Sequence, residues 1–538
     1  MSTQPSLPVL IVGAGPIGLV TALALSFYKI PFQLFEEDGT LSLDTKAGTI
    51  LTRTLEAFRR YGVADDVLAR ALRIDEIGSI ERATNIARDS VRTDVLRDET
   101  RYPFVINLPQ HHLEPILAAK VEASPYGQMH KQHRLTRFDQ QADRVVVHLD
   151  TPDGPREVEG SYLLACDGGR SVVRQQMGVE VEGKTLDVRY LLVDFKVDFD
   201  VQNARDYPYL AYFSDPEEWM ILVRHPHCWR FLFPIDLTGL EPDEEQLRAK
   251  VRRFIGDVAN IEYLGKVVYR VHHRIASSWK DGRVMLMGDA AHLITPMWAL
   301  GLNTGVLDAI NLPWRLAWVL RGWADAKLLT GYEREQHPIA ANGSGELAES
   351  ARLAMSSEGQ AEVGASGDNK WGNACTRTML GVSLDVTGNG GGSMVKRGAT
   401  ASPIQVGDRF PDWELHDASG RALRLHDLTD DSFVALYFTD ARRRPAIAAN
   451  TSPALQNFLV SRWDAPLDSG LRESSLLDPG SRLFKRLGIP ADTLVLIRPD
   501  DHIAAICPMA STTVDALYKA ATGSLPPTQQ NWSTHDFA

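Results

Sequence analysis

Apolar runs and turns at the start of the chain follow the order of a strand, a helix and a second strand. Val9 to Val12 is a short β-branched run that ends in glycines, and the small apolar residues from Leu19 to Phe27 are typical of a helix. Pro31 to Phe35 forms the second apolar run. Such a strand–helix–strand unit places its two strands parallel. The pattern therefore predicts an α/β fold built on a Rossmann-like, doubly wound sheet.

Two later changes of pattern divide the rest of the chain. From about residue 188 to residue 234, aromatic and β-branched residues alternate as in a mostly antiparallel sheet. Residues 356–401 are rich in Gly, Ser, Thr and Asn, which is typical of a linker, and two apolar runs beyond them indicate a further small α/β domain. We therefore predict a first domain made of residues 1–180 and 270–355, an inserted sheet domain of residues 181–269, a linker of residues 356–401 and a C-terminal domain of residues 402–538.

Composition narrows the class of protein. The 538 residues are 44% hydrophobic, enough for several cores. With 57 basic and 69 acidic residues the net charge is −12, so we expect no nucleic-acid partner. The four cysteines form no CxxC pair, and no run has the length or flanks of a signal peptide or membrane span. We expect a cytoplasmic protein without a metal site or a membrane partner.

A glycine triplet follows the first predicted strand. Gly13, Gly15 and Gly18 match GxGxxG, and Pro16 opens the helix behind them. The first glycine permits the tight turn, the second lets a pyrophosphate approach the backbone, and the third lets the helix pack closely on the strand. Glu36 ends the second strand, where its carboxylate can accept ribose hydroxyls. The triplet predicts a dinucleotide site without separating NAD from FAD.

A second motif favours FAD. Residues 283–287 form an apolar strand that ends in Gly288 and Asp289. A carboxylate at such a strand end can hydrogen-bond the hydroxyls of a ribityl chain, which FAD has and NAD lacks. Asp289 therefore argues against a plain NAD dehydrogenase.

Three fingerprints together resemble those of the group A FAD-dependent aromatic hydroxylases, the family of p-hydroxybenzoate hydroxylase, phenol hydroxylase and 3-(3-hydroxyphenyl)propionate hydroxylase. They are the glycine triplet, the segment 166–174 that contains Asp167 and Arg174, and the Gly-Asp-Ala-Ala-His run of residues 288–292. The C-terminal domain resembles the thioredoxin-like tail of phenol hydroxylase relatives. It has no redox cysteine pair, so we expect packing or a homodimer contact as its role.

The resemblance implies a set of cofactor contacts. Lys46 is expected near the FAD phosphates, Gln110 on the flavin, and Asp289 on the ribityl chain. Asp167 and Arg174 match a turn linked to FAD and NAD(P)H binding, and a purely structural role for that turn stays open. At a helix start, the backbone N–H groups of Gly301, Leu302 and Asn303 would face the flavin pyrimidine edge, and the positive helix end would stabilise the anionic reduced flavin.

Candidate substrate contacts lie in the middle of the chain. Arg230 matches an arginine that borders the active site in the family, and Pro296 would offer its backbone carbonyl to a substrate hydroxyl. Tyr212, Arg224 and Trp298 are further candidates for substrate contact. For Arg230 the alternative is an interdomain salt bridge, and the sequence identifies no general base.

The implied activity is a monooxygenase reaction. In the family, hydride from NAD(P)H reduces FAD, O₂ adds at flavin C4a, and the hydroperoxide transfers its terminal oxygen to a phenolic or related aromatic ring. The expected partners are therefore an aromatic small-molecule substrate and O₂. Since the chain has a single GxGxxG, NAD(P)H would dock transiently on a surface without a Rossmann motif. Epoxidation, Baeyer–Villiger oxidation and a non-catalytic flavin-binding role remain alternatives.

Overall fold

The computed structural model describes residues 7–41, 48–82, 84, 86–198, 207–215, 218–239, 241–258, 260–355, 404–440, 451–462, 475–509 and 513–523. The predicted linker and Lys46 lie outside the described residues. None of the described helices is both long enough and apolar enough to cross a membrane.

The predicted strand–helix–strand unit is confirmed, and it starts a six-stranded sheet that we call the cofactor sheet. Its order is β18 (Lys280–Asp281), β19 (Val284–Leu286), β12 (Tyr162–Ala165), β1 (Val9–Val12), β2 (Phe32–Phe35) and β8 (Gly127–His130). Every neighbouring pair is parallel except β18 with β19. Helix α1 (Pro16–Phe27) leads from β1 to β2 and packs against α4 (Gln110–Glu122) and α8 (Leu300–Leu320). All four residues of β1 are buried, as expected for a central parallel strand.

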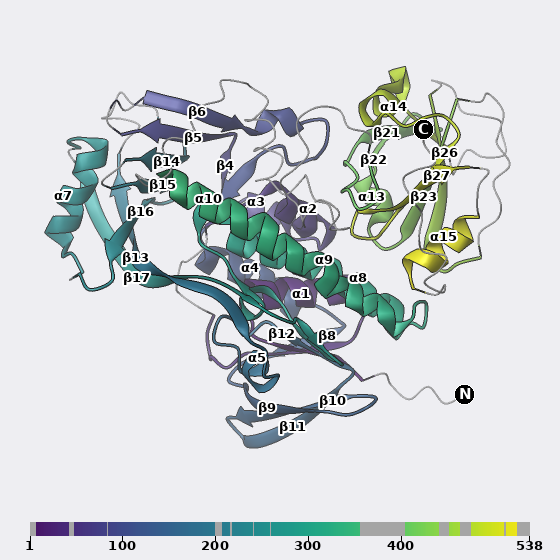
Figure 1. The fold of residues 1–538 in the computed structure, drawn as a ribbon, viewed down its shortest axis with the longest axis horizontal. Coiled ribbons are helices and arrows are strands. Elements are labelled where there is room, and N and C mark those ends of the chain that lie inside the picture. Colours follow the sequence, from purple (N-terminus) through teal and green to yellow (C-terminus); the bar gives the residue numbers. More distant parts are fainter. Residues whose placement is uncertain are drawn as a thin grey trace.

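An eight-stranded sheet, the middle sheet, forms the second layer (Figure 1). Its order is β20 (His292–Leu293), β17 (Ile261–Ala276), β13 (Val181–Val197), β16 (Trp229–Asp236), β15 (Met220–Arg224), β14 (Leu210–Ser214), β5 (Glu76–Glu81) and β6 (Ile86–Arg92). Neighbouring strands are antiparallel except β14 with β5. The sheet is wider than residues 181–269, because β5 and β6 join it through the distant pairing of β5 with β14.

The two faces of the middle sheet have different coverings. Leu191 and Val193 point to the face under helix α7 (Glu244–Ile255). Tyr190 and Leu192 point to the opposite face, which packs against Met297 at the start of α8 and against helix α10 (Glu346–Met355). We call this second face the inner face, because it lies toward the cofactor sheet's helices.

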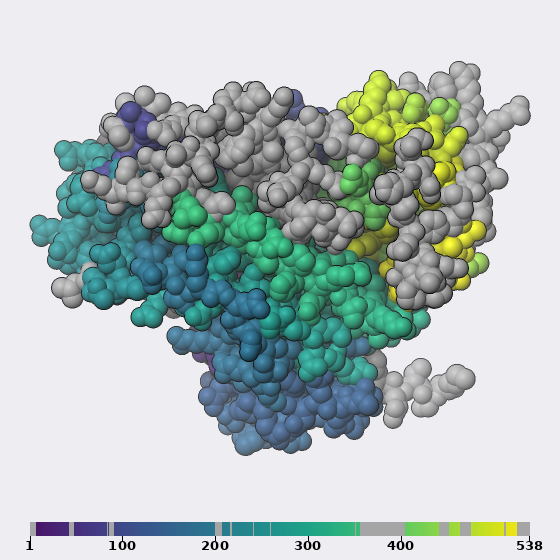
Figure 2. All heavy atoms as spheres, in the orientation of Figure 1, coloured from purple at the N-terminus to yellow at the C-terminus, as the bar shows by residue number. Residues whose placement is uncertain are grey.

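The C-terminal residues form a third, seven-stranded sheet. Its order is β22 (Ala422–Arg424), β21 (Glu414–Asp417), β25 (Ser475–Leu477), β24 (Leu455–Ser461), β23 (Phe433–Thr439), β26 (Thr493–Ile497) and β27 (Ile503–Pro508). The two apolar runs predicted as strands correspond to β23 and β26, which are buried throughout. Figure 2 shows residues 300–355, in green, between the middle sheet and this C-terminal domain on the visible face.

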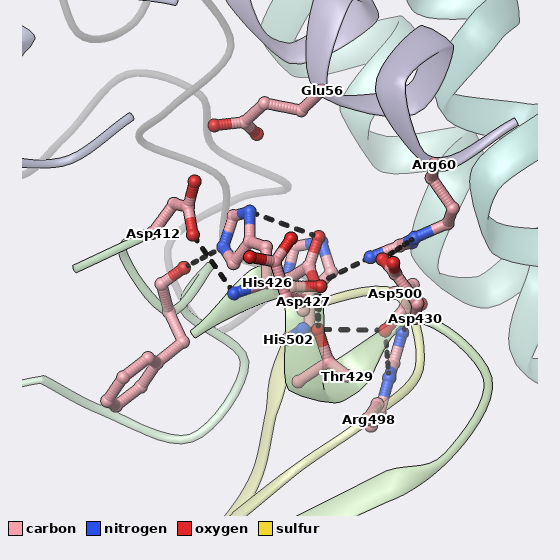
Figure 3. A network of polar contacts seen from close by, with 12 residues as sticks. Glu56, Arg60, Asp412, His426, Asp427, Thr429, Asp430, Arg498, Asp500 and His502 are labelled. Carbon is pink, nitrogen blue, oxygen red and sulfur yellow. Dashed lines mark hydrogen bonds and ion pairs between the residues drawn. The ribbon is translucent and has the colours of Figure 1, made fainter. Parts of the chain in front are cut away.

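Buried ion pairs join the C-terminal domain to the rest of the chain (Figure 3). Between β26 and β27, Asp501 accepts hydrogen bonds from Arg53 at 2.7 Å and from Arg60 at 2.6 Å, both on helix α2 (Thr52–Arg60). Arg498 pairs with Glu335 of helix α9 (Thr330–Pro338) at 2.9 Å. All five side chains are buried, so the contact is part of the interior.

Candidate functional site

The glycine turn after β1 has the geometry that a bound pyrophosphate needs. Gly13 has φ +96°, and a Cβ there would lie 2.3 Å from the Cys166 carbonyl oxygen. A Cβ on Gly18 would lie 1.9 Å from the Gly13 carbonyl oxygen, so the helix can pack this closely only without a side chain. At Gly15 a Cβ would meet nothing within 4 Å, and no side chain caps the helix that begins at Pro16. The open space beside Gly15 at a helix N-terminus fits an anionic group.

Glu36 lies at this turn, as the sequence predicts. Its Oε2 accepts a hydrogen bond from the Ala14 N–H at 2.6 Å, and its Oε1 accepts one from the Asp38 N–H at 3.0 Å. A carboxylate has further lone pairs, so these two bonds leave acceptor capacity for ribose hydroxyls. The carboxylate thus supports the turn and remains suited to a ribose.

Three motif segments meet at one edge of the cofactor sheet. Val12 pairs with Ala165, and Ala165 pairs with Leu286, so these parallel strands end side by side. Asp167 and Asp289 therefore follow neighbouring strand ends close to the glycine turn. The carboxyl edge of a parallel sheet is where such folds bind ligands.

Arg174 connects the second and third motifs. It donates to the Ala290 carbonyl at 2.8 Å and to the Gly169 carbonyl at 2.7 Å. Asp167 accepts from the Val173 N–H at 3.2 Å through Oδ2, whereas its buried Oδ1 has no hydrogen-bond partner in the described part of the chain. Burial raises the pKa of the Asp167 carboxyl. Arg174 thus has the structural role that the sequence left open, and the Asp167 oxygen remains able to accept a bond from a ligand.

His292 supports the Gly-Asp turn from within the core. Its Nε2 lies 2.8 Å from Asp308 Oδ2, which also accepts from the Gly288 N–H at 2.8 Å. Both the His292 and the Asp308 side chains are fully buried. These contacts assign His292 to the structure of the turn.

The chain has a strained conformation where it enters α8. Trp298 (φ 58°) and Ala299 (φ 56°) are consecutive left-handed residues that are not glycine. Such residues cost of the order of 1–3 kcal/mol each and concentrate at functional sites. The N–H groups of Gly301 and Leu302 lie in the first turn of α8, where a helix supplies no intrahelical partner, and a Cβ on Gly301 would lie 3.9 Å from its nearest neighbour. The positive end of a 21-residue helix therefore faces open space.

Asn303 fixes the start of α8 to the chain around strand β3 (Thr49–Ile50). Its Oδ1 accepts from the Leu51 N–H at 2.9 Å and from Thr54 Oγ1 at 2.7 Å, and its Nδ2 donates to the Thr49 carbonyl at 3.1 Å. The side chain also donates to the Ala299 carbonyl at 2.6 Å and is thereby fully used in positioning the helix, while its backbone N–H lies inside the helix, beyond the first-turn N–H groups that a cofactor could approach.

Gln110 begins α4, and Pro296 precedes the turn that leads into α8. Gln110 donates to Glu114 Oε1 at 2.7 Å, while the preceding Leu108 N–H donates to the Gly48 carbonyl at 2.7 Å. The Pro296 carbonyl accepts a long bond of 3.2 Å from the Ala299 N–H. Its second lone pair is left for another donor.

An aromatic cluster covers the inner face of the middle sheet opposite α8. The rings of Tyr212 and Trp298 have centroids 4.4 Å apart, and Tyr190 lies 5.3 Å from Trp219 and 6.1 Å from Tyr269. The Tyr190 Oη is buried and has no hydrogen-bond partner among the described residues. Burial raises the pKa of the Tyr190 hydroxyl, so it stays a neutral donor. The sequence predicted Tyr212 and Trp298 but missed Tyr190 and Tyr269, whose signal is only the alternation along β13 and β17.

The two candidate arginines lie on opposite faces of the middle sheet. Arg230, 4% exposed, donates from Nε and Nη2 to the two carboxylate oxygens of Asp194, each at 2.8 Å. It lies on the inner face, because it alternates with Leu232 of the inner-face core. An ion pair is thus present, and it is within the sheet and not between domains. Arg224 lies on the α7 side, with its guanidinium 5.3 Å from the Trp229 ring centroid.

His225, the neighbour of Arg224 in the sequence, is a buried side chain. It is 1% exposed, and neither ring nitrogen has a hydrogen-bond partner among the described residues. A Cβ on Gly48 would lie 2.3 Å from its Cε1. Burial and nearby positive groups, Arg230 first among them, hold the pKa of His225 well below its usual value. An unsatisfied buried imidazole points to a missing ligand or water partner.

Comparison with known proteins identifies the class to which this site belongs. The sequence model of the FAD binding domain matches residues 6–343, so the chain belongs to this family of FAD-binding proteins. Its relatives are monooxygenases, and the chain is a flavoprotein monooxygenase of the aromatic-hydroxylase type, as its motifs predicted.

Two relatives illustrate how far the likeness extends. The chain is 30% identical to tetracenomycin B2 monooxygenase-dioxygenase of Streptomyces olivaceus, over 93% of this chain and 94% of that protein. It is 29% identical to para-nitrophenol 4-monooxygenase of Pseudomonas sp. (strain WBC-3), over 62% of this chain and 83% of that protein. Among solved structures, the flavin-dependent monooxygenase PieE in complex with FAD and substrate shares the fold, with a TM-score of 0.78, 24% identity and coverage of 97% and 100% of the two chains.

Proposed function

We propose that the protein hydroxylates a phenolic or related aromatic ring, using NAD(P)H as the reductant and O₂ as the oxygen source. The observation that carries the proposal is the aromatic cluster on the inner face, where the buried Tyr190 hydroxyl has no hydrogen-bond partner in the part of the chain that the structure describes. This cluster reaches the start of α8 through the contact of Tyr212 with Trp298. A phenolic ring would find both aromatic packing and a hydrogen-bond donor there.

The described residues suit FAD. The open side of Gly15 fits the pyrophosphate, Glu36 the ribose, and Asp289 the ribityl chain. The first-turn N–H groups at Gly301 and Leu302 would stabilise negative charge on the pyrimidine edge. When bound, FAD supplies the acceptance of hydride and the activation of O₂, which side chains do not provide.

The protein would hold the substrate between the middle sheet and α8. Trp298 and Tyr212 would pack on the ring and exclude water, while the Tyr190 hydroxyl donates to the substrate oxygen. The Pro296 carbonyl would accept from a substrate hydroxyl and so favour its phenolate character. Arg230 lies on the same face, where its guanidinium would help to hold an anionic ring or the reduced flavin even though Asp194 balances its charge.

The test is product analysis with ¹⁸O₂ and either NADH or NADPH. The panel should include para-nitrophenol and tetracenomycin B2, the compounds for which two relatives are named. One labelled oxygen atom on an aromatic ring carbon, with substrate-stimulated NAD(P)H oxidation, is the expected result. An epoxide as the product would instead indicate epoxidation, and a ring-expanded ester would indicate Baeyer–Villiger oxidation. FAD binding without any substrate-stimulated turnover would indicate a non-catalytic flavin carrier.

For the C-terminal residues 402–538 we propose a thioredoxin-like domain with a packing role. Support comes from its mixed sheet, with β23, β24 and β25 parallel and β26 and β27 antiparallel. The buried ion pairs with α2 and α9 support packing as its role.

The free cysteines Cys166, Cys228 and Cys507 are compatible with a reducing cytoplasm.

A further inference from the structure

A hollow of about 710 Å³ lies at the end of the middle sheet on the α7 side. It is formed by the end of β13, the turn between β15 and β16, helix α7 and the start of β17. Its basic lining residues are Lys196, Arg224, His227, Arg248 and Arg252, against two acidic ones, Asp198 and Glu262. The lining is therefore positively charged on a protein whose net charge is −12.

Among the described residues, part of this positive charge is not paired with a carboxylate. Lys196 pairs with Glu262 at 3.1 Å, and Arg248 pairs with Glu244 at 2.5 Å. Arg224 and Arg252, in contrast, have no carboxylate partner among the described residues. Solvated basic side chains are common on protein surfaces, but here they converge from separate elements into a concave site, where low-dielectric walls focus their field. A ligand with several negative charges would complement such a site.

The hollow is adjacent to the candidate flavin site. His227 lines it, and its ring centroid lies 6.2 Å from that of His112, which lies 4.1 Å from that of His111. His111 follows Gln110 at the start of α4. In the same turn as His227, the His225 ring packs against Gly48 beside that helix start. The turn therefore connects the hollow to the start of α4, where the candidate flavin contact Gln110 lies.

We propose that this hollow binds the phosphate groups of the nicotinamide dinucleotide that reduces the flavin. The inference rests on the proposed function, which requires NAD(P)H. The chain has one GxGxxG, and FAD would occupy it, so a second dinucleotide needs another phosphate site. The planar forks of Arg248 and Arg252 suit phosphate oxygens, and the adjoining turn would lead the nicotinamide end toward α4.

The kinetic test uses the FAD-loaded protein and the variants Arg252→Ala and Arg248→Ala. Each should raise the KM for NAD(P)H about tenfold while kcat and FAD content stay at the wild-type level, because a contact to a non-reacting part of the ligand is lost. Arg253→Ala is the matched control, since Arg253 is on the same helix, pairs with Glu218 at 3.3 Å and does not line the hollow. A larger effect with NADPH than with NADH would assign the 2′-phosphate to the hollow, and equal effects would assign the pyrophosphate.

A binding measurement separates this inference from the proposed function. Calorimetric titration of the FAD-loaded protein with 2′,5′-ADP and with ADP should show binding that Arg252→Ala weakens and that rising salt weakens further. If the wild type oxidises NAD(P)H and both arginine variants keep its KM within twofold, the hollow is not the site and the proposed function stands. If the wild type neither binds nor oxidises NADPH or NADH, the inference and the proposed reductant are both wrong.

Discussion

Asp501→Ala should strongly destabilise the protein, because the Asp501 carboxylate of the C-terminal domain pairs with two buried arginines of helix α2. The carboxylate is 1% exposed and accepts from Arg53 at 2.7 Å, Arg60 at 2.6 Å and Thr429 at 2.6 Å. Burial acts to raise the pKa of Asp501, but Arg60, His426 and Arg53 outweigh it and hold that pKa well below its ordinary value. The carboxylate is thus ionised at neutral pH.

The expected magnitude follows from what remains after the substitution. Arg53 keeps Glu56 and the Asp500 carbonyl, and Arg60 keeps Asp430, so each guanidinium loses one of its charged partners inside the protein. Removing one member of a buried ion pair costs about 3–5 kcal/mol. The substitution should also weaken FAD binding, because Thr54 of α2 donates a hydrogen bond to Asn303 at the start of α8. We therefore expect both a lower melting temperature and faster FAD release.

The assay is thermal unfolding of the FAD-loaded protein, followed by flavin fluorescence and by circular dichroism. Asp75→Ala is the control, since Asp75 also pairs with an arginine but is 58% exposed, and such pairs contribute at most about 1 kcal/mol. If Asp501→Ala and Asp75→Ala melt at the same temperature, the buried network does not stabilise the domain contact, and the reasoning fails.

Four further outcomes are expected. Gly15→Val should abolish FAD retention with little change in the apoprotein's circular dichroism, since the new side chain would enter open space and not the core. Unchanged FAD affinity would place the pyrophosphate elsewhere. Tyr190→Phe should lower kcat/KM for a phenol by up to about tenfold without loss of stability, because its Oη has no partner in the described chain. A lower melting temperature with normal kinetics would contradict this. Arg230→Ala should reduce hydroxylation more than FAD binding, whereas a purely structural role for its pair with Asp194 predicts lost stability with normal turnover per folded molecule. His502→Asn should flatten the stability profile between pH 6.5 and about 4, because burial lowers the pKa of His502 to about 4 and the wild type loses roughly 3 kcal/mol as pH falls through that window. Parallel pH profiles for wild type and variant would show that another group titrates there.

Local patterns predicted the elements that local forces determine. The residues of β1, the glycine turn and α1 follow one another directly in the chain, and Glu36 follows the next strand of the same strand–helix–strand unit, so the sequence located them. The pairing of β5 with β14 joins Ser79 to Tyr212, and no local signal marks such distant strands as neighbours. The same holds for Arg230, whose partner Asp194 depends on the register between β13 and β16.

The candidate site shows the same limit. The significance of Tyr190 and His225 lies in burial without a hydrogen-bond partner among the described residues, which only three-dimensional packing reveals. Arg224 was predicted beside Arg230 in sequence, but the strands alternate, and it lies on the other face of the sheet. Residue type thus identifies candidate side chains but not the face of the sheet on which each one lies.

The ion pairs between α2 and the C-terminal domain also impose an order on biosynthesis. Arg53 and Asp501 are 448 residues apart in the chain. At about 5–20 residues per second, roughly 20–90 s pass between the synthesis of the two. Until then the charged face of α2 must remain hydrated, because burying it unpaired would cost several kcal/mol per charge. The flavin-binding part of the nascent chain therefore keeps the arginines of α2 exposed to solvent until Asp501 has been synthesised. If translation stalls before residue 501, chaperones and proteases should still be able to bind this exposed surface.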